Sequence, residues 1–243
     1  GFCYLKMPDG NCYFGNWPRL YPIGGREPEE VLVPDDYLTL ADAWAATEYG
    51  DLIKVAEGTY AGCASAPGLG GRRLEGGYNA AFTERDWETY TTVIDAAAGP
   101  LDAGEEMDGI LVDGFHFVGT PAAARADEQA RLEGRYVRVG DCVFRDGASG
   151  LAAEADSTAG GYVFVEECFF YDLEGTAIAV DHHSGTHTDI LTNTLVEAGD
   201  VGIHVHITGA DSTCRVHRNI VGWSDTGVEA GTSLIPDIWA CDV

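Results

Sequence analysis

The sequence predicts an all-β solenoid, in which each coil of a parallel β-helix takes about 25–27 residues. The first observation is a column of large apolar side chains that returns at intervals of 27, 26, 25 and 26 residues: Phe117, Phe144, Phe170, Leu195 and Val221. Two further columns keep the same period: Phe115, Cys142, Cys168, Asn193 and Asn219, and Leu151, Ile178, Ile203 and Val228. Three columns in phase indicate a stack of repeating units that each contact their neighbours.

The second observation is that the residue types and their alternation within each repeat are typical of β-strands. Residues 110–117, 137–144 and 163–170 are short runs of β-branched and aromatic residues with alternating polarity, bounded by Gly and Asp. Helical repeats would need longer runs with a 3.6-residue period, and the repeats contain none. We therefore expect each strand to pair with the same strand of the coils above and below, about 4.8 Å away.

Two parts of the chain depart from the period. Residues 1–34 do not follow it and are predicted as an irregular segment, either a hairpin around Pro8-Asp9-Gly10 or a contact between subunits. The β-helix is predicted to span 35–243. Within it, residues 119–135 have helical rather than strand propensity, so we expect a non-strand interruption there.

A helix is predicted at residues 38–49, just before the first coil. Thr39 can serve as its N-cap, and Gly50 can end it. One face would carry Leu40, Ala43, Trp44 and Thr47. Such a helix can cover the open end of a solenoid, where strand edges would otherwise stay unpaired.

Composition limits the partners. The 243 residues include 40 Asp and Glu against 14 Lys and Arg, a net charge of −26, which disfavours nucleic acid and anionic membranes. No apolar run of about eighteen residues occurs, so no membrane span is predicted. The 32 glycines suit coil corners with positive φ. No motif requires a cofactor, although the acidic surface keeps calcium as a candidate.

Residues 50–60, GDLIKVAEGTY, and 74–96, LEGGYNAAFTERDWETYTTVIDA, add a resemblance. Together with the preceding helix they resemble the start of a right-handed parallel β-helix of the pectin-lyase-like superfamily, in particular bacterial secreted and surface repeat proteins. The resemblance covers about residues 38–243 and implies the fold, not the activity. The superfamily's catalytic signatures are missing; Asn193-Thr194-Leu195, for example, lacks the carboxylate of the polygalacturonase motif. Their absence argues against an enzyme.

Seven cysteines without a CxxC motif suggest secretion with some disulfides, hence an extracellular or cell-surface location. The candidate disulfides join Cys3 to Cys12 across the predicted turn, and Cys214 to Cys241 one coil apart. The column of Cys142, Cys168, Asn193 and Asn219 is predicted to be a structural ladder, with the asparagines hydrogen-bonded along the stack. Its two cysteines either form a disulfide or pack as buried thiols.

One outward-facing cluster could carry chemistry. The repeat places Glu154, Asp181 and His206 in a stack beside His204 and Glu229, with His182 and His183 at the next corner. Glu154, Asp181 and His206 are candidate acid–base residues, and Asp181, His204, His206 and Glu229 are candidate metal ligands. The alternative is a polar surface without chemistry.

The function predicted first is a structural surface protein that polymerises head to tail with itself. One period beyond Cys214 and Val216 lie Cys241 and Val243, so the sequence stops within a predicted strand. Either more chain follows, or another subunit pairs with this open strand edge. The candidate assembly residues are Phe2, Tyr4, Tyr13, Phe14, Trp17, Trp239 and Val243. The alternatives are a polysaccharide lyase or glycoside hydrolase, or a sugar-binding adhesin module.

Overall fold

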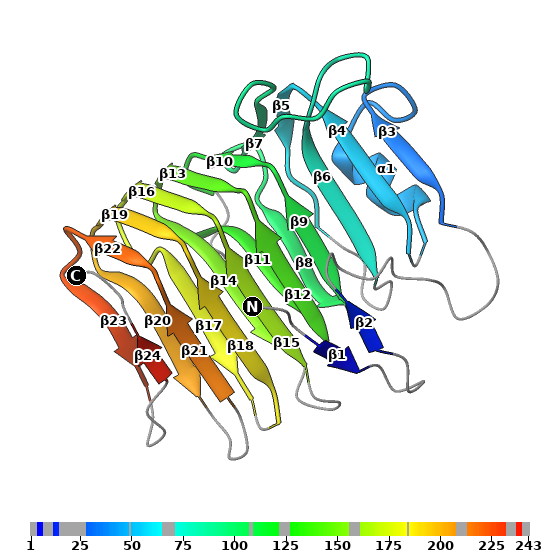
Figure 1. The fold of residues 1–243 in the computed structure, drawn as a ribbon. Coiled ribbons are helices and arrows are strands. Elements are labelled where there is room, and N and C mark those ends of the chain that lie inside the picture. Colours follow the sequence, from blue (N-terminus) through cyan, green and yellow to red (C-terminus); the bar gives the residue numbers. More distant parts are fainter. Residues whose placement is uncertain are drawn as a thin grey trace.

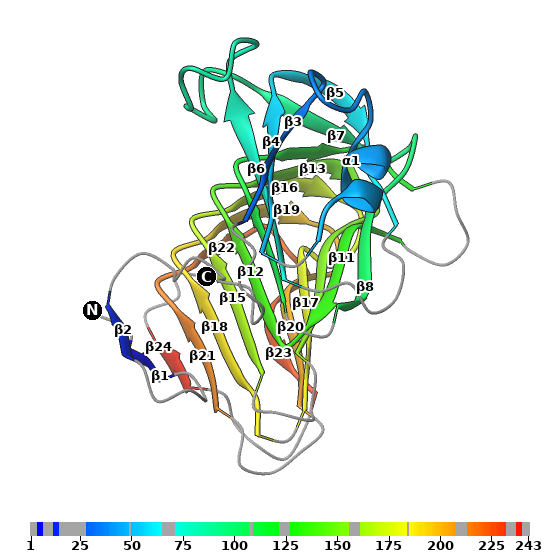
Figure 2. The same ribbon diagram turned by 90° about the vertical axis from the view of Figure 1, so that its right-hand side faces the viewer.

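The computed structural model shows a parallel β-solenoid of about seven turns, as the sequence predicts (Figure 1). It describes residues 4–6, 12–14, 28–48, 50–64, 71–106, 109–121, 127–155, 161–183, 185–207, 213–231 and 237–239. Three parallel sheets form the walls, and the apolar core lies between them (Figure 2).

Each sheet collects one strand from successive coils. The nine-stranded sheet contains β3 (Glu30–Val33), β4 (Leu52–Ala56), β6 (Arg72–Tyr78), β9 (Ile110–Asp113), β12 (Tyr136–Gly140), β15 (Tyr162–Glu166), β18 (His187–Leu191), β21 (Thr213–His217) and β24 (Asp237–Trp239). The seven-stranded sheet contains β5 (Gly58–Ala61), β7 (Thr92–Asp95), β10 (His116–Val118), β13 (Val143–Gly147), β16 (Phe169–Leu173), β19 (Thr194–Ala198) and β22 (Ile220–Gly222). The six-stranded sheet contains β8 (Leu101–Glu106), β11 (Glu128–Gly134), β14 (Ser149–Ala155), β17 (Ile178–His182), β20 (Val201–Ile207) and β23 (Thr226–Ala230).

The predicted apolar columns are confirmed residue by residue. Phe117 pairs with Phe144 and Phe144 with Phe170, and the column continues through Leu195 to Val221. The three phenylalanine rings are buried and stacked, with centroids 4.6 and 4.7 Å apart. The column from Leu151 to Val228 is likewise in register. In-register stacking lets one side-chain shape fill the core coil after coil.

The predicted asparagine ladder is also confirmed. Asn193 and Asn219 are buried at 1% exposure, and Asn193 Nδ2 donates to Asn219 Oδ1 at 3.0 Å. Cys142 and Cys168, above them in the column, are buried free thiols. The structure thus selects the thiol alternative over a Cys142–Cys168 disulfide.

In the described residues, non-glycine residues with positive φ occupy coil corners alongside the glycines expected from composition. Asp141, Glu167, Thr192 and Arg218 precede the four ladder residues and have φ between 49° and 57°. Gly114 takes the equivalent corner one coil earlier. A left-handed conformation costs a non-glycine residue about 1–2 kcal/mol. Inter-coil hydrogen bonds, such as those from Glu167 N to the Leu191 carbonyl at 3.3 Å and from Thr192 N to the His217 carbonyl at 3.1 Å, help to offset that strain.

The predicted interruption at 119–135 is wrong for its second half. Residues Glu128–Gly134 form β11, which pairs with β8 and β14. Ala130 lies opposite Leu151, only 21 residues later in the chain, because the extra residues of this coil precede the strand. Strand partners on both sides outweigh the helical propensity of a seven-residue segment. Residues 122–126 lie outside the described part.

The predicted helix forms as α1 (Leu40–Ala46), shorter than 38–49. Thr39 is its N-cap, accepting the Asp42 backbone N–H at 3.1 Å, and Leu40, Ala43 and Trp44 are buried in the core. That α1 caps the solenoid, and that the solenoid is right-handed, stay predictions. In the described ranges no helix is long and apolar enough to cross a bilayer.

Before the solenoid, β1 (Tyr4–Lys6) and β2 (Cys12–Phe14) form the expected antiparallel hairpin. It lies outside the nine-stranded sheet in both views (Figures 1 and 2). Its register pairs Cys12 with Lys6, and Cys3 lies outside the described residues. Cys214 is a buried free thiol, so the predicted Cys214–Cys241 disulfide is wrong. The predicted register of the last strand is wrong as well, because Val216 pairs with Ile238 of β24 and not with Val243. Burial between stacked coils, not cross-linking, accounts for Cys214.

Candidate functional site

The candidate site lies on the outer face of the six-stranded sheet. Strand pairing places Glu133 beside Glu154, Glu154 beside Asp181, and Asp181 beside His206. This row of four side chains runs across β11, β14, β17 and β20. The predicted stack of Glu154, Asp181 and His206 is therefore present.

A second outward row runs parallel to the first, two residues earlier on each strand. It consists of Arg131, Ala152, Ala179, His204 and Glu229. His204 and Glu229 thus lie beside the first row, as the repeat predicted. The small side chains of Ala152 and Ala179 lie between the long side chains of Arg131 and His204.

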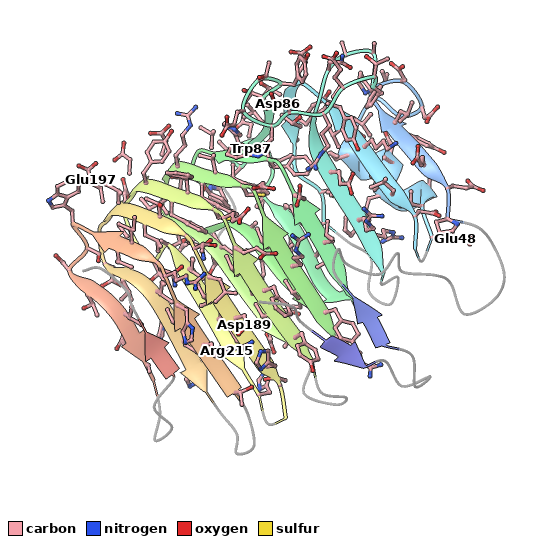
Figure 3. The ribbon with its side chains drawn as sticks, viewed as in Figure 1. Glu48, Asp86, Trp87, Asp189, Glu197 and Arg215 are labelled. Atoms are coloured by element: carbon pink, nitrogen blue, oxygen red, sulfur yellow. The ribbon has the colours of Figure 1, made fainter. Side chains whose placement is uncertain are left out.

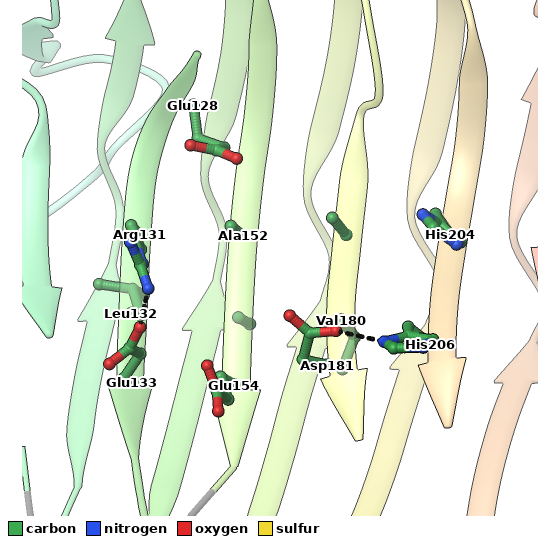
Figure 4. A pocket seen from close by; sticks show the side chains of 12 residues that line it. Glu128, Arg131, Leu132, Glu133, Ala152, Glu154, Val180, Asp181, His204 and His206 are labelled. Carbon is green, nitrogen blue, oxygen red and sulfur yellow. Dashed lines mark hydrogen bonds and ion pairs between the residues drawn. The ribbon is translucent and has the colours of Figure 1, made fainter. Parts of the chain in front are cut away.

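This difference in size leaves a depression of about 410 Å³ in the sheet face (Figure 4). Ala152 and Ala179 form its floor, Arg131 and His204 close its two ends along the solenoid axis, and the acidic row borders one side. Glu128 contributes a further carboxylate to the lining. Neighbouring strands of a parallel stack lie about 4.8 Å apart, so the carboxylates of the acidic row follow one another at regular intervals along the depression.

The three stacked carboxylates repel one another, and each has a basic partner. Glu133 pairs with Arg131, Glu154 with His183 at 2.7 Å, and Asp181 with His206 at 3.0 Å. These pairs are exposed or only partly buried, and each contributes at most about 1 kcal/mol of stability. Their main effect is to hold the carboxylates in place along the depression.

Arg131, Glu133 and His183 complete the site; the sequence analysis placed His183 at the next corner of this cluster but did not identify the other two. The first two lie on β11, the segment predicted not to be a strand, so its outward positions were not counted. Their signal was the Arg-x-Glu spacing, which places both on one face of a strand. His183 was placed at the neighbouring corner, and its contact with Glu154 is between coils.

The described residues contain no group of three or more His, Cys, Asp or Glu side chains arranged to hold a metal ion. Asp181, His204, His206 and Glu229 therefore share a surface without converging on one point. Calcium binding stays a prediction.

The arrangement suits hydrogen bonding more than acid–base catalysis. The Glu154 and Asp181 side chains are 36% and 54% exposed, so water solvates both. A glycosidase's general acid works instead from apolar surroundings that favour its protonated form. The catalytic roles predicted for Glu154, Asp181 and His206 gain no support from this environment.

The other predicted residues do not enter this site. The side chains of the assembly candidates, Phe2, Tyr4, Tyr13, Phe14, Trp17, Trp239 and Val243, lie outside the described part. So do those of Cys3, Cys12, Cys241 and His182. Comparisons with known protein families, with curated proteins and with solved structures find no match.

Proposed function

We propose that this protein is an extracellular β-solenoid that binds a neutral polysaccharide along the outer face of its six-stranded sheet without cleaving it. The depression over Ala152 and Ala179, bordered by the row of carboxylates, carries the proposal. The extracellular setting and a right-handed winding rest on the resemblance of residues 38–243 to secreted β-helix proteins.

The lining matches the chemistry of a sugar. Carboxylates accept hydrogen bonds from hydroxyl groups, Arg131 donates them, and the rings of His204 and His206 add further hydrogen-bonding nitrogens. The alanine floor leaves room for the apolar face of a sugar ring. A net charge of −26, with four carboxylates around the depression, repels an anionic chain and favours a neutral one.

The proposal is tested by titrating the purified chain with soluble neutral and uronic-acid polysaccharides in a calorimeter. We expect binding of a neutral polysaccharide, and its loss in Ala179→Trp, which fills the depression. The matched control is Val196→Trp, which places the same ring on the outer face of the seven-stranded sheet. Binding that survives Ala179→Trp, or that is equally lost in the control, would overturn the proposal.

Assay of reducing ends during the same titrations separates binding from cleavage. We expect none to form. Turnover that is lost in Asp181→Ala would instead establish the lyase or hydrolase alternative.

End-to-end assembly into a fibre is the second candidate, and two exposed apolar side chains favour it. Leu38, next to α1, is 80% exposed, and Trp223, after the edge strand β22, is 81% exposed. Large exposed apolar side chains suit contacts between copies of the chain. Negative-stain electron microscopy should show filaments that Trp223→Asp shortens, whereas single particles at all concentrations would exclude this candidate.

A further inference from the structure

An outward aromatic side chain is buried on the nine-stranded sheet, whereas an outward aromatic side chain on the seven-stranded sheet is exposed. Phe164, which points outward between the core residues Val163 and Val165, is only 8% exposed. On the seven-stranded sheet the outward Phe169 is 47% exposed. Outward residues of a solvated sheet face are normally accessible, so the two faces have different surroundings.

The outer face of the nine-stranded sheet has an aromatic centre. The rings of Tyr136 and Tyr162 stack at 5.8 Å, and Tyr162 also lies 6.1 Å from Phe164 and 5.4 Å from His187. Strands β12, β15 and β18 supply these four side chains in adjacent register positions.

Ion pairs border the aromatic centre. Arg215 binds Asp189 through two hydrogen bonds of 2.6 and 2.5 Å (Figure 3). Arg138 binds Glu166 at 2.8 Å. Tyr136, Arg138, Phe164 and Arg215 also take part in further interactions beyond these pairs. An aromatic centre within a charged rim is the usual composition of a protein docking surface.

The N-terminal segment of the same chain has matching chemistry. Residues 1–27 include six aromatic residues: Phe2, Tyr4, Tyr13, Phe14, Trp17 and Tyr21. Lys6, Arg19 and Arg26 against Asp9 and Glu27 give the segment a charge of +1, so the other 216 residues carry −26 − 1 = −27. The segment is thus attracted to the rest of the chain.

The segment can also reach this face. Its hairpin, β1 and β2, lies outside the nine-stranded sheet, and residues 15–29 join it to β3, the edge strand of that sheet (Figures 1 and 2). Fifteen extended residues span up to about 50 Å. Strand β15 lies five strands from β3, or about 24 Å.

We propose that residues 1–27 dock on the outer face of the nine-stranded sheet of their own chain and cover the aromatic centre around Phe164. The segment is then a strap across several coils, and it is separate from both the depression and the ends of the solenoid.

Hydrogen exchange of the full-length chain tests the docking. We expect Phe164→Glu to speed amide exchange in residues 1–27 by about tenfold or more, because it removes the burial of one aromatic side chain. Phe169→Glu, the same change on the seven-stranded sheet, should leave exchange in the segment unaltered. Circular dichroism confirms that both variants keep the fold, and Phe164→Ser replaces Phe164→Glu if they do not. Exchange that is unaffected by the Phe164 change would overturn the proposal.

Carbodiimide cross-linking of the wild-type chain tests whether the docking is within one copy. Lys6 and Lys54 are the only lysines, so cross-links from the hairpin are easily assigned. We expect Lys6 to couple to carboxylates of this face, such as Glu166, within a single chain. Cross-links found only between differently isotope-labelled copies, or none to this face, would overturn it.

Discussion

Asn193 and Asn219 hold successive coils together through a single oxygen. The Oδ1 atom of Asn219 accepts both the backbone N–H of Asn193 at 2.9 Å and its Nδ2 at 3.0 Å. Asn193 in turn accepts the Cys168 N–H at 3.0 Å and donates to the Val165 carbonyl at 2.9 Å. The ladder therefore satisfies backbone groups that the turn at each corner leaves without strand partners.

Asn193→Ala should destabilise the protein strongly. The change leaves the buried Cys168 N–H and Val165 carbonyl without these partners, at about 1–3 kcal/mol for each group. We expect a total loss of about 3–5 kcal/mol in urea unfolding. Thr194→Ala, at the neighbouring half-buried position, should cost less than about 1 kcal/mol; equal effects would contradict the ladder.

Leu132 tests whether residues 128–134 form a strand of the core. Its side chain is 1% exposed, so Leu132→Ala should cost about 2–5 kcal/mol through lost burial and a cavity. The neighbouring Arg131 points outward, and Arg131→Ala should cost about 1 kcal/mol or less. Were the segment a solvent-exposed interruption, both changes would be mild in the same unfolding experiment.

The buried carboxylate of Asp189 should make stability depend on acid pH. Burial raises its pKa, but the hydrogen bonds and charges of His187 and Arg215 outweigh burial and hold the pKa below its ordinary value. A depressed pKa contributes stability that is present above the unfolded-state value near 3.8 and is lost as the pH falls through the folded-state value. We expect the free energy of unfolding to fall below about pH 4, and to fall less in Asp189→Asn.

Removing Arg215 alone should lower the free energy of unfolding more than removing the charges of both Arg215 and Asp189. Arg215→Ala leaves the Asp189 carboxylate, 1% exposed, without its main counter-charge. Arg215 itself is 42% exposed, so the expected loss is moderate, about 2 kcal/mol at pH 7. The double variant with Asp189→Asn should regain part of this loss, and a double-mutant cycle measures the coupling. Additive losses would show that the pair does not interact.

Deprotonation of the Cys214 thiol should lower the stability of the protein at alkaline pH. Burial raises its pKa from 9.0 to about 12, with the charge of Asp189 adding to the effect. The unfolded thiol therefore loses its proton first, and its contribution to stability is full below pH 9 and lost between pH 9 and 12. We expect Cys214→Ala to flatten the pH dependence of unfolding in that range. At pH 8 the native Cys214 should resist iodoacetamide, and rapid labelling would contradict its burial.

Asp181→Asn should change binding without changing stability. Asp181 and His206 are both at least half exposed, and pairs of this kind contribute less than about 1 kcal/mol. Thermal unfolding should therefore coincide with that of the wild type. A large loss of stability would mean that the pair supports the fold, so that binding data from this variant could not be assigned to the depression.

Much of the candidate site could be predicted because the repeat lies within strands. Once Leu151, Ile178 and Ile203 define the inward column, alternation along a strand sends Glu154, Asp181 and His206 outward in one row. Counting back one period from Leu151 did not find its partner Ala130, because the extra residues of that coil come before the strand rather than within it. Arg131 and Glu133 were missed for that reason.

The sequence by itself determined the period, the columns of the core and the outward row of acids and histidine, because parallel in-register stacking depends only on residue spacing. Only the tertiary structure decided the pairing of β11, the thiol state of Cys142, Cys168 and Cys214, and the depression between Arg131 and His204. These features depend on where extra residues are placed and on how side chains of unequal size meet across coils. The spacing of residues in the sequence determines neither the placement of the extra residues nor the contacts between these side chains.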